Sequence, residues 1–383
     1  MVENKISKIS YGQLGIIVHD SCKEMGKKIN EHITKMRENH FKDNDSDHFV
    51  QRLQDSYIIE SENIRFANGE AKGVLGESIR GKDIYILADI GNYSIKYKMF
   101  GKENHMSPDD HFQDIKRLIS AIAGKARRIS VIMPMLYSGR QDKRNTRESL
   151  DCAMALQELE NLGVENIFTF DAHEPRVQNA IPLIGFESLH PTFEIIKTML
   201  STDIKINVDK SQLLVISPDT GAMDRAIYYA NVMGLDVGMF YKRRDYKKIV
   251  NGKNPIIQHE YMGSQIAGKD VLIVDDMIAS GESVFEIAKE LKKRNARNIY
   301  VAVSFALFTE GINKMDRYYQ DGIISKLFAT NLTYIPNTIK NAEWFKEVDM
   351  SYLISLLIDA VNYDDSVSPL LDATNKIKSI LDK

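Results

Sequence analysis

The chain has 383 residues, of which 43% are hydrophobic and 27% are charged, a composition typical of soluble globular proteins. This length is too great for one compact core, so we expect two domains. The formal net charge of -3 argues against a protein that binds nucleic acid, and the lack of any run of about 18 apolar residues argues against a membrane protein. Two distant cysteines and a polar start predict a cytoplasmic protein that acts on small molecules.

The first hundred or so positions show one amphipathic helix and two short strands. Apolar residues recur at steps of three and four between Cys22 and Met36, the spacing of such a helix. The polar and acidic stretch 41–55 is interpreted as a surface linker or an insertion. Short strands are expected at Tyr57 to Ile59 and at Ile84 to Ala88, and the turn-prone sequence Phe66 to Glu70 lies between them.

Beyond position 109, apolar strands alternate with amphipathic helices. The expected strands are 129–133, 167–170, 213–217, 237–240, 271–274 and, as the last, 299–303; the expected helices are 115–122, 150–162, 193–200, 223–233 and 284–291. The segment from Gly91 to Met106 has no clear pattern and is interpreted as a loop. This alternation predicts an α/β fold with mainly parallel sheets that are flanked by helices.

Two related α/β domains account for this order of elements. A strand that ends in a proline and a turn of small residues occurs in both halves of the chain. We expect a boundary near Ser188 to Thr192, which gives domains 1–187 and 188–383. The tail beyond Pro336 contains an apolar helix-like run, Tyr352 to Val361, which we assign to packing or to a subunit contact.

Charged side chains follow the expected strands. They lie in the segments Arg140-Gln141-Asp142, Asp171-Ala172-His173, Pro218-Asp219-Thr220-Gly221, Lys242-Arg243-Arg244 and Asp275-Asp276. Ligands of parallel sheets bind beyond the carboxyl ends of the strands. We therefore interpret these alternating cations and carboxylates as one site.

The stretch from Val271 to Ser283 contains the most informative of these segments. Four apolar residues run into Asp275 and Asp276, then into a turn of small residues, and an amphipathic helix follows that Ser280 or Ser283 would cap. The N-terminus of a helix offers unpaired backbone N–H groups to a phosphate, and the two carboxylates can bind sugar hydroxyls or a cation. The pattern favours a phosphorylated sugar as ligand; an ordinary strand, turn and helix with two solvated acids is the alternative.

The run Asp-Asp-Met-Ile-x-Ser-Gly-x-Ser resembles the ribose-phosphate loop of the type I phosphoribosyltransferase fold, in the form used by ribose-phosphate diphosphokinases, also called PRPP synthetases. The resemblance extends from Phe66 to Asn331 and is weak before Asp109. It implies two phosphoribosyltransferase-like domains. It also implies that ribose phosphate is bound by Asp219, Asp275, Asp276, Ala279, Ser280, Gly281, Glu282 and Ser283, and that ATP is bound by Phe66, Asn68, Gly69, Glu70, Arg140, Gln141 and Asp142.

The same resemblance implies a reaction and its catalytic groups. Lys242 and Arg244 match the catalytic cations of the family's Lys-Arg-Arg loop, and His173 matches a catalytic position. His173 and Asp219 match positions that hold Mg²⁺, although this ion prefers oxygen ligands, so His173 is expected to act through water or on the phosphates. In the implied reaction ATP transfers its β,γ-diphosphoryl group to the C1 hydroxyl of ribose 5-phosphate. The family also implies nucleotide biosynthesis and a homo-oligomer, based on dimers and up to a hexamer.

Several positions depart from the family's pattern. Ala279 and Glu282 stand where the diphosphokinases usually have aspartate and glycine, and Asn68 replaces a common aspartate. A non-catalytic regulatory homologue, a phosphoribosyltransferase that acts on a base, and a diphosphokinase for another ribose 5-phosphoryl acceptor are therefore alternatives. We expect Glu282 to face solvent, because an inward carboxylate would repel a bound phosphate.

Overall fold

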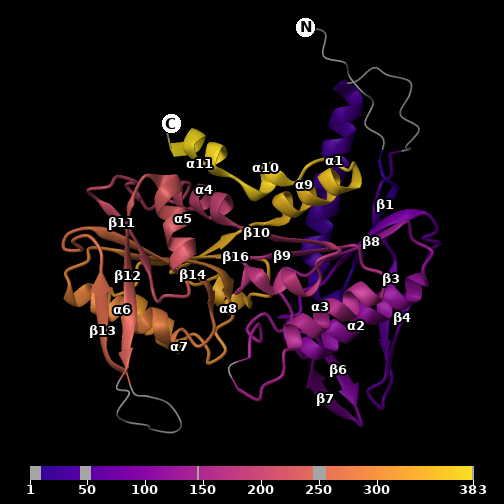
Figure 1. The fold of residues 1–383 in the computed structure, drawn as a ribbon, viewed down its shortest axis with the longest axis horizontal. Helices are drawn as coiled ribbons and strands as arrows, with labels where there is room; N and C mark the ends of the chain where they lie inside the picture. The colour runs from indigo at the N-terminus through magenta and orange to yellow at the C-terminus, as the bar shows by residue number, and fades with distance from the viewer. Residues whose placement is uncertain (1–9, 44–52, 145, 245–255, 382–383) are drawn as a thin grey trace. The chain divides into compact units, whose positions relative to one another are not determined.

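The structure is a computed structural model that describes residues 10–43, 53–144, 146–244 and 256–381. The chain divides into two compact units (Figure 1). Unit 1 comprises 1–190, 332–334 and 350–372, and unit 2 comprises 191–331, 335–349 and 373–383. Most of the expected polar stretch 41–55 lies outside the described residues. No helix in the described ranges is both long and apolar enough to cross a membrane.

Unit 1 is built on a parallel sheet with the strand order β10-β9-β8-β5-β1-β2. Its strands are β1 (Gln13–Val18), β2 (Ile58–Ile59), β3 (Ser61–Arg65), β4 (Ala71–Leu75), β5 (Lys82–Leu87), β6 (Lys96–Met99), β7 (Lys102–His105), β8 (Arg128–Ile132), β9 (Asn166–Phe170) and β10 (Gly185–Leu189). Its helices are η1 (Asp20–Cys22), α1 (Lys23–Asp43), α2 (Pro108–Ile122), α3 (Asp151–Asn161), η2 (Pro175–Ala180), α9 (Ser351–Asn362) and α10 (Ser368–Leu371). The pairs β3–β4 and β6–β7 form separate antiparallel hairpins.

The core of unit 1 follows from the alternation of its buried strands. Alternate residues such as Ile84 and Ile86 of β5 join one apolar cluster with Phe112 and Leu118 of α2 and Leu156 of α3. Helices α1 and α9 lie side by side (Figure 1). Both faces of the sheet are therefore covered, as an all-parallel sheet requires.

Helix α9, which is late in the sequence, is tied to the rest of unit 1 by buried polar contacts. Arg37 donates hydrogen bonds to Asp359 and to Asn362 at 2.9 Å each. The guanidinium of Arg128 donates to both carboxylate oxygens of Asp83 at 2.8 Å and to the carbonyl oxygen of Val361 at 2.7 Å. The tail was expected in the second domain as a whole, but these contacts place 350–372 in unit 1.

Unit 2 is built on a seven-stranded sheet with the order β13-β12-β11-β14-β15-β16-β17, in which only β12 and β13 pair antiparallel. Its strands are β11 (Leu213–Ser217), β12 (Asp236–Arg244), β13 (Ile256–Met262), β14 (Asp270–Ile278), β15 (Ile299–Ala306), β16 (Lys326–Thr330) and β17 (Phe345–Val348). Its helices are α4 (Thr192–Leu200), α5 (Met223–Met233), α6 (Glu282–Lys293), α7 (Asn313–Gln320), α8 (Asn337–Lys340) and α11 (Thr374–Leu381). Side chains of α6 and α7 join the apolar core of this sheet.

The predicted α/β class, with mainly parallel sheets flanked by helices, is confirmed. Several expectations about single elements are wrong. The segment 91–106, interpreted as a loop, contains the hairpin β6–β7; β1 was not predicted at all; and β16 and β17 follow the strand that was expected to be the last. The hairpin has few apolar residues because most of its side chains are exposed or half-buried, so it carries no strong hydrophobic pattern.

Candidate active site

In unit 2 the order of strands along the chain reverses at β11. The chain passes from β11 to β12 on one side and returns to β14 on the other, with Ile216 opposite Ile273. Crevices of this kind, beyond the carboxyl ends of the strands, are where α/β sheets bind ligands. The turn at Asp219 and the pair Asp275 and Asp276 therefore come together at this edge.

The aspartate pair lies within a strand, which corrects the expectation that the strand ends at Val274. Strand β14 continues to Ile278, because its pairing with β15 continues from Asp275 opposite Val303 to Ile278 opposite Ala306. Asp276 is buried, with 5% of its surface exposed. The two carboxyl groups are thus fixed on a rigid element, where a hydrogen bond joins their side chains.

Burial and the neighbouring charge of Asp276 raise the pKa of Asp275 to about 8. The guanidinium of Arg225 lies 4.0 Å from Asp275 Oδ1, and the backbone N–H of Asp276 donates to the same oxygen at 2.9 Å. These two contacts only partly offset the cost of an ionised pair. A bound cation or a group that donates hydrogen bonds would favour the ionised form.

The turn after β14 leads into α6 without a side-chain cap. Gly281 is the N-cap with φ 79°, a left-handed conformation that favours glycine, and the expected cap by Ser280 or Ser283 is absent. Ser280 Oγ is 3.4 Å from the backbone nitrogen of Glu282, a long contact. Ala279 and Ser280 are half-buried. The start of α6 therefore lacks the side-chain acceptor that helices usually have there.

Glu282, the first residue of α6, has an exposed side chain, as expected. At this position its charge complements the positive end of the helix dipole. Exposure also means that water screens its carboxylate. The residue is thus compatible with an anion bound at the turn.

Asp219 is held in a tight turn after β11. Its Oδ1 accepts from the backbone N–H groups of Gly221 at 2.9 Å and Ala222 at 3.2 Å, and the hydroxyl of Ser217 donates to its carbonyl oxygen. Among the described residues, Oδ2 accepts no hydrogen bond. This oxygen fits the preference of Mg²⁺ for oxygen ligands. No cluster of three or more His, Cys, Asp or Glu side chains in the described ranges is arranged to hold a metal ion.

Lys242 and Arg244 lie on β12, so their backbones continue the strand and do not form a loop after it. Their partners in the antiparallel ladder are His259 and Ile256 of β13. The side chains of both residues lie outside what the structure describes. Their predicted catalytic role stays a prediction.

In unit 1, the predicted adenine-binding segment is the turn between β3 and β4. The backbone N–H of Phe66 donates to the carbonyl oxygen of Glu70, and Gly69 has φ 94°. The ring of Phe66 is 43% exposed, and Asn68 donates from its side chain to Glu70 at 2.9 Å. An exposed ring at a stiff turn is able to stack on a flat ligand.

The segments after β8 and β9 lie near each other in unit 1. The charge of Asp142 contributes to a raised pKa of Arg176, whose main cause is the hydrogen bond to Glu174. Arg140 and Gln141 are exposed, as is His173, while Oδ2 of Asp142 is buried and has no hydrogen-bond partner among the described residues.

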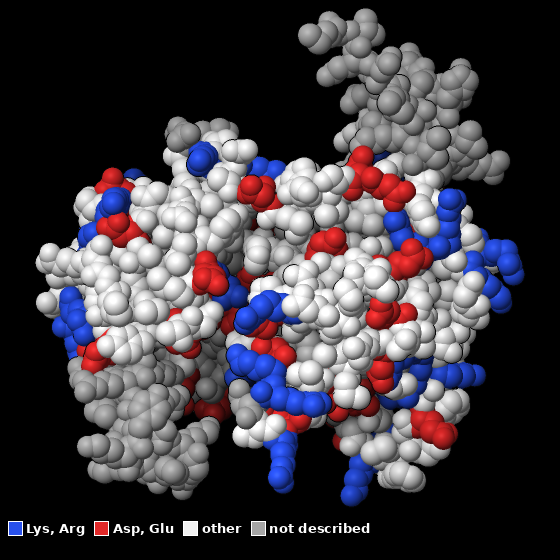
Figure 2. Space-filling view, in the orientation of Figure 1, with Lys and Arg blue, Asp and Glu red and all other residues white. Residues whose placement is uncertain are grey.

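The segment between β8 and α3 is strongly basic. It carries Arg140, Lys143, Arg144 and Arg147, all with exposed side chains. Figure 2 shows Lys and Arg side chains gathered over this part of unit 1. Such a surface attracts anionic ligands.

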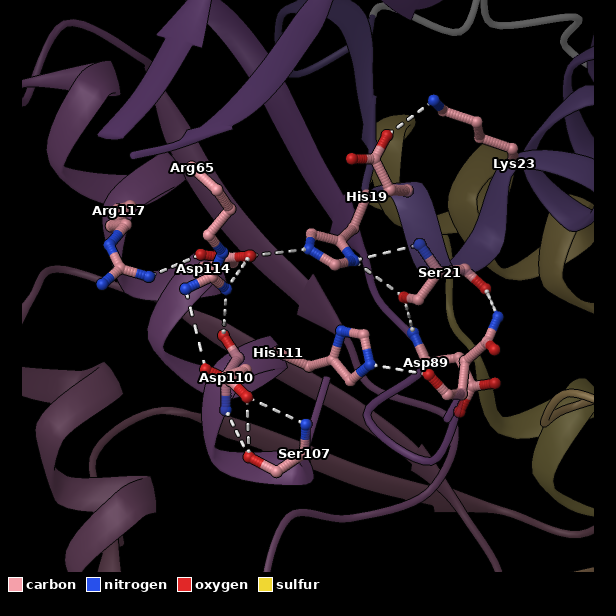
Figure 3. A network of polar contacts seen from close by, with 12 residues as sticks. His19, Ser21, Lys23, Arg65, Asp89, Ser107, Asp110, His111, Asp114 and Arg117 are labelled. Carbon is pink, nitrogen blue, oxygen red and sulfur yellow. Dashed lines mark hydrogen bonds and ion pairs between the residues drawn. The ribbon is translucent and has the colours of Figure 1, made fainter. Parts of the chain in front are cut away.

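A buried polar network that the sequence analysis missed lies beyond the ends of β1 and β5 (Figure 3). Ser21 donates from its backbone to His19 Nδ1 at 3.1 Å, so Nε2 carries the proton and faces Asp114 Oδ2 at 3.4 Å. Arg65 and Arg117 donate to Asp114 at 2.8 and 2.6 Å. The sequence feature that could have indicated this network is the run of polar residues that directly follows the apolar residues of β1.

His111 completes this network. Its Nε2 lies 2.8 Å from the carbonyl oxygen of Asn92, and its ring meets that of His19 edge to face at 5.3 Å. Burial lowers the pKa of His111 to about 4, so the ring is neutral at physiological pH.

Two family models match the sequence. The N-terminal domain of ribose phosphate pyrophosphokinase matches residues 14–163, and the phosphoribosyl transferase domain matches residues 187–329. Together these ranges span most of the chain.

Curated relatives and a solved structure agree with these matches. The ribose-phosphate pyrophosphokinase of Rhizobium meliloti is 24% identical over 311 residues, which cover 80% of this chain and 90% of the relative. That of Mycoplasma pneumoniae is 26% identical over 312 residues, covering 80% and 85%. The crystal structure of phosphoribosylpyrophosphate synthetase from Mycobacterium smegmatis superposes with a TM-score of 0.71 at 18% identity, covering 91% of this chain and 98% of that one. At 18% identity, this superposition shows that the two proteins share a fold.

Proposed function

The chain belongs to the ribose-phosphate pyrophosphokinase family, and we propose that it transfers the β,γ-diphosphoryl group of ATP to the C1 hydroxyl of ribose 5-phosphate. In this reaction the C1 oxygen bonds to the β-phosphorus and its hydroxyl proton is released to solvent. The bond from the β-phosphorus to the oxygen that it shares with the α-phosphorus breaks, and AMP leaves with that oxygen. The product, 5-phosphoribosyl 1-diphosphate, serves nucleotide biosynthesis.

The observation that carries this proposal is the juxtaposition at the β11–β14 edge of unit 2. Carboxylates suited to sugar hydroxyls, Asp275 and Asp276, precede a turn that opens an uncapped helix. In the proposal the ribose hydroxyls bind the carboxylates, and the 5-phosphate binds the backbone of Ala279 to Ser283. The exposed Glu282 supports ribose 5-phosphate over a different acceptor, because its carboxylate is turned to solvent.

We assign ATP to unit 1. The exposed ring of Phe66 supports a role in stacking on adenine, and Asn68, Gly69 and Glu70 belong to the same turn. Arg140, Gln141 and Asp142 lie in or beside the basic segment of Figure 2, which suits a triphosphate.

Lys242 and Arg244 are proposed to stabilise the negative charge that spreads over the transferred group in the transition state. When bound, Mg²⁺ would neutralise charge on the phosphates of ATP. Oδ2 of Asp219 accepts no hydrogen bond from the described part of the chain, which supports this residue as a ligand of the ion. His173 is proposed to act through water or on the phosphates, because imidazole is a poor ligand for this ion.

The proposal also covers the oligomeric state and the cellular location of the protein. We expect a cytoplasmic homo-oligomer based on dimers and up to a hexamer. Sedimentation of the purified chain tests this: a monomer across the micromolar range contradicts it.

The central experiment incubates the protein with ATP, Mg²⁺ and ribose 5-phosphate and follows AMP. We expect AMP in equal amount to 5-phosphoribosyl 1-diphosphate, and none when ribose 5-phosphate or Mg²⁺ is omitted. Protein that binds ATP but forms no AMP would contradict the proposal and favour a regulatory homologue or another acceptor. Exchanging ribose 5-phosphate for other ribose 5-phosphoryl compounds separates those two outcomes.

A further inference from the structure

A pocket on unit 2 lies between α6 and α7. It has a volume of about 390 Å³. Its lining residues are Lys289, Asn313, Lys314, Arg317, Tyr318, Asp321 and Ile323. None of them belongs to the proposed ATP or ribose-phosphate sites.

The lining carries three cations and one carboxylate, so it attracts anions. Lys289, Lys314 and Arg317 all have exposed side chains, and none forms an ion pair with any residue in the described part of the chain. Lys314 and Arg317 are three residues apart on α7 and therefore share one face, where like charges repel. An anion bound between them would relieve that repulsion.

The ammonium group of each of the two lysines lies over an aromatic ring. The ammonium of Lys289 lies 5.2 Å from the ring centre of Tyr318, and that of Lys314 lies 5.1 Å from the ring centre of Phe285. Because the lysines cover these rings, the pocket offers charge and not a stacking surface for a base. The geometry favours a compact anion with several charges.

The wall of this pocket reaches the turn that is proposed to bind the sugar phosphate. The rings of Phe285 and Tyr318 are 4.7 Å apart, and both side chains are buried. Phe285 also packs under Gly281, where an added Cβ would lie 2.5 Å from Phe285 Cε2. A shift of the Phe285 ring is therefore felt directly at the N-cap of α6.

We propose that the pocket between α6 and α7 binds a compact polyphosphate anion, of which inorganic diphosphate is the simplest, and that its occupancy changes the affinity of the turn at Gly281 for sugar phosphate. The binding stands on the pocket alone, while the coupling to sugar phosphate rests on the proposed function. Ligands at the two sites would change each other's affinity by the same factor.

The chain contains a built-in reporter for the binding step. Trp344 is the sole tryptophan, and its indole N–H donates to Asp316 of α7 at 2.7 Å. Asp316 belongs to the same helix as Lys314 and Arg317, so an anion whose binding shifts α7 would change the surroundings of the indole. Tryptophan fluorescence therefore reports on α7.

The test titrates diphosphate into the full chain without Mg²⁺ and follows tryptophan fluorescence. We expect a saturable change that becomes at least tenfold weaker in Lys289→Gln/Arg317→Gln, and in Lys314→Gln as a second variant. Lys293→Gln is the matched control, since Lys293 is exposed on the same helix but does not line the pocket. Titrations that are equal in all four proteins overturn the site.

The coupling is tested by measuring sugar-phosphate affinity with and without saturating diphosphate. We expect a change of at least threefold in the unaltered protein and in Lys293→Gln, and none in the double variant. An equal change in all three proteins shows that diphosphate competes at the turn itself, which overturns the coupling. Lack of AMP formation with the fluorescence response intact would instead overturn the proposed function alone.

Discussion

The two units treat the same topological feature in opposite ways. In each sheet the order of strands reverses beside a central strand, at β1 and β5 in unit 1 and at β11 and β14 in unit 2. In unit 1 this edge is occupied by the buried network of His19, Ser21, His111 and Asp114 (Figure 3). In unit 2 it holds a carboxylate pair beside an uncapped turn.

The difference shows in the pKa values of one carboxylate from each unit, Asp114 in unit 1 and Asp275 in unit 2. Burial raises the pKa of Asp114, but hydrogen bonds from His19 and Arg117 and the charge of Arg65 outweigh burial and leave it lowered. Burial and a second carboxylate raise that of Asp275 to about 8. The strand order thus provides a location where a ligand can bind. The side chains around it decide whether its carboxylate is already paired within the chain or is left to bind a substrate.

The largest expected effect is on stability, at the ends of β1 and β5 in unit 1, where the buried network around Asp114 lies. Asp114→Ala leaves Arg65, Arg117 and His19 without their shared acceptor and should lower the free energy of unfolding by about 3 to 5 kcal/mol. Urea unfolding measures this. The control, Glu158→Ala, breaks an exposed ion pair with Lys116 in the same unit and should cost less than about 1 kcal/mol. Similar losses for both variants would mean that the network contributes nothing special.

At the proposed site beyond the strand ends of unit 2, we expect substitutions to lower turnover and not stability. Lys242→Ala and Arg244→Ala should each raise the activation free energy by about 3 kcal/mol or more, because these cations are proposed to act on charge that develops in the transition state. Steady-state kinetics should show a fall in kcat with the KM for ATP little changed. Unchanged kcat with a raised KM would refute this role.

Asp276→Asn should weaken sugar-phosphate binding by about 1.5 to 3 kcal/mol, the range for hydrogen bonds to charged groups. An amide removes the charge and turns one acceptor into a donor. Calorimetric titration with ribose 5-phosphate measures the change. If affinity stays the same while the melting temperature falls sharply, Asp276 is structural and the two edges are more alike than proposed.

The two edges should also respond oppositely to pH. Asp275 has a folded-state pKa above its unfolded value, so it takes up a proton on folding, and its effect on stability becomes unfavourable as pH rises from about 4 to 8. Asp275→Asn should therefore raise the free energy of unfolding at pH 8 by about 1.4 kcal/mol or more and leave it unchanged near pH 4. Asp114, with a lowered pKa, loses its favourable contribution only in acid. Parallel pH profiles for the Asp275 and Asp114 variants would contradict the comparison.

The smallest effect is expected at Glu282. Because its side chain is exposed, Glu282→Gly should change the KM for ribose 5-phosphate by less than tenfold, which is less than about 1.4 kcal/mol. Initial-rate measurements at saturating ATP provide the test. A hundredfold tightening would show that the carboxylate guards the turn, and another acceptor would then have to be sought.

The sequence predicts best where buried strands and helices have strong patterns. Strand β11 and helix α5 were expected with the bounds that they have, Leu213–Ser217 and Met223–Met233. The extension of β14 through Asp275 and Asp276 was not predictable from composition, because it is imposed by pairing with β15 and not by local propensity. The prediction that Ser280 or Ser283 caps α6 was wrong for a related reason. The N-cap is Gly281, whose left-handed conformation is unfavourable for serine.

The network around His19 shows what sequence patterns leave out. Its members come from the start of η1 after β1, from β3, from the loop after β5 and from α2, so their spacing in the sequence carries no sign of their contact. The resemblance to a known family pointed to the open edge of unit 2. It did not point to the buried network of unit 1, where the chain itself supplies most of the polar partners and only His111 Nδ1 and Arg65 Nε lack a hydrogen-bond partner among the described residues.

The anchoring of α9 has a consequence for the order in which the protein is synthesised. All six strands of the unit 1 sheet are translated before unit 2, yet α9, which packs beside α1 and accepts hydrogen bonds from Arg128 and Arg37, is translated near the end. Until then Arg128 has only its partners within the sheet, and the surface that α1 offers to α9 stays exposed. A nascent chain therefore carries an unfinished first unit through the synthesis of most of the second.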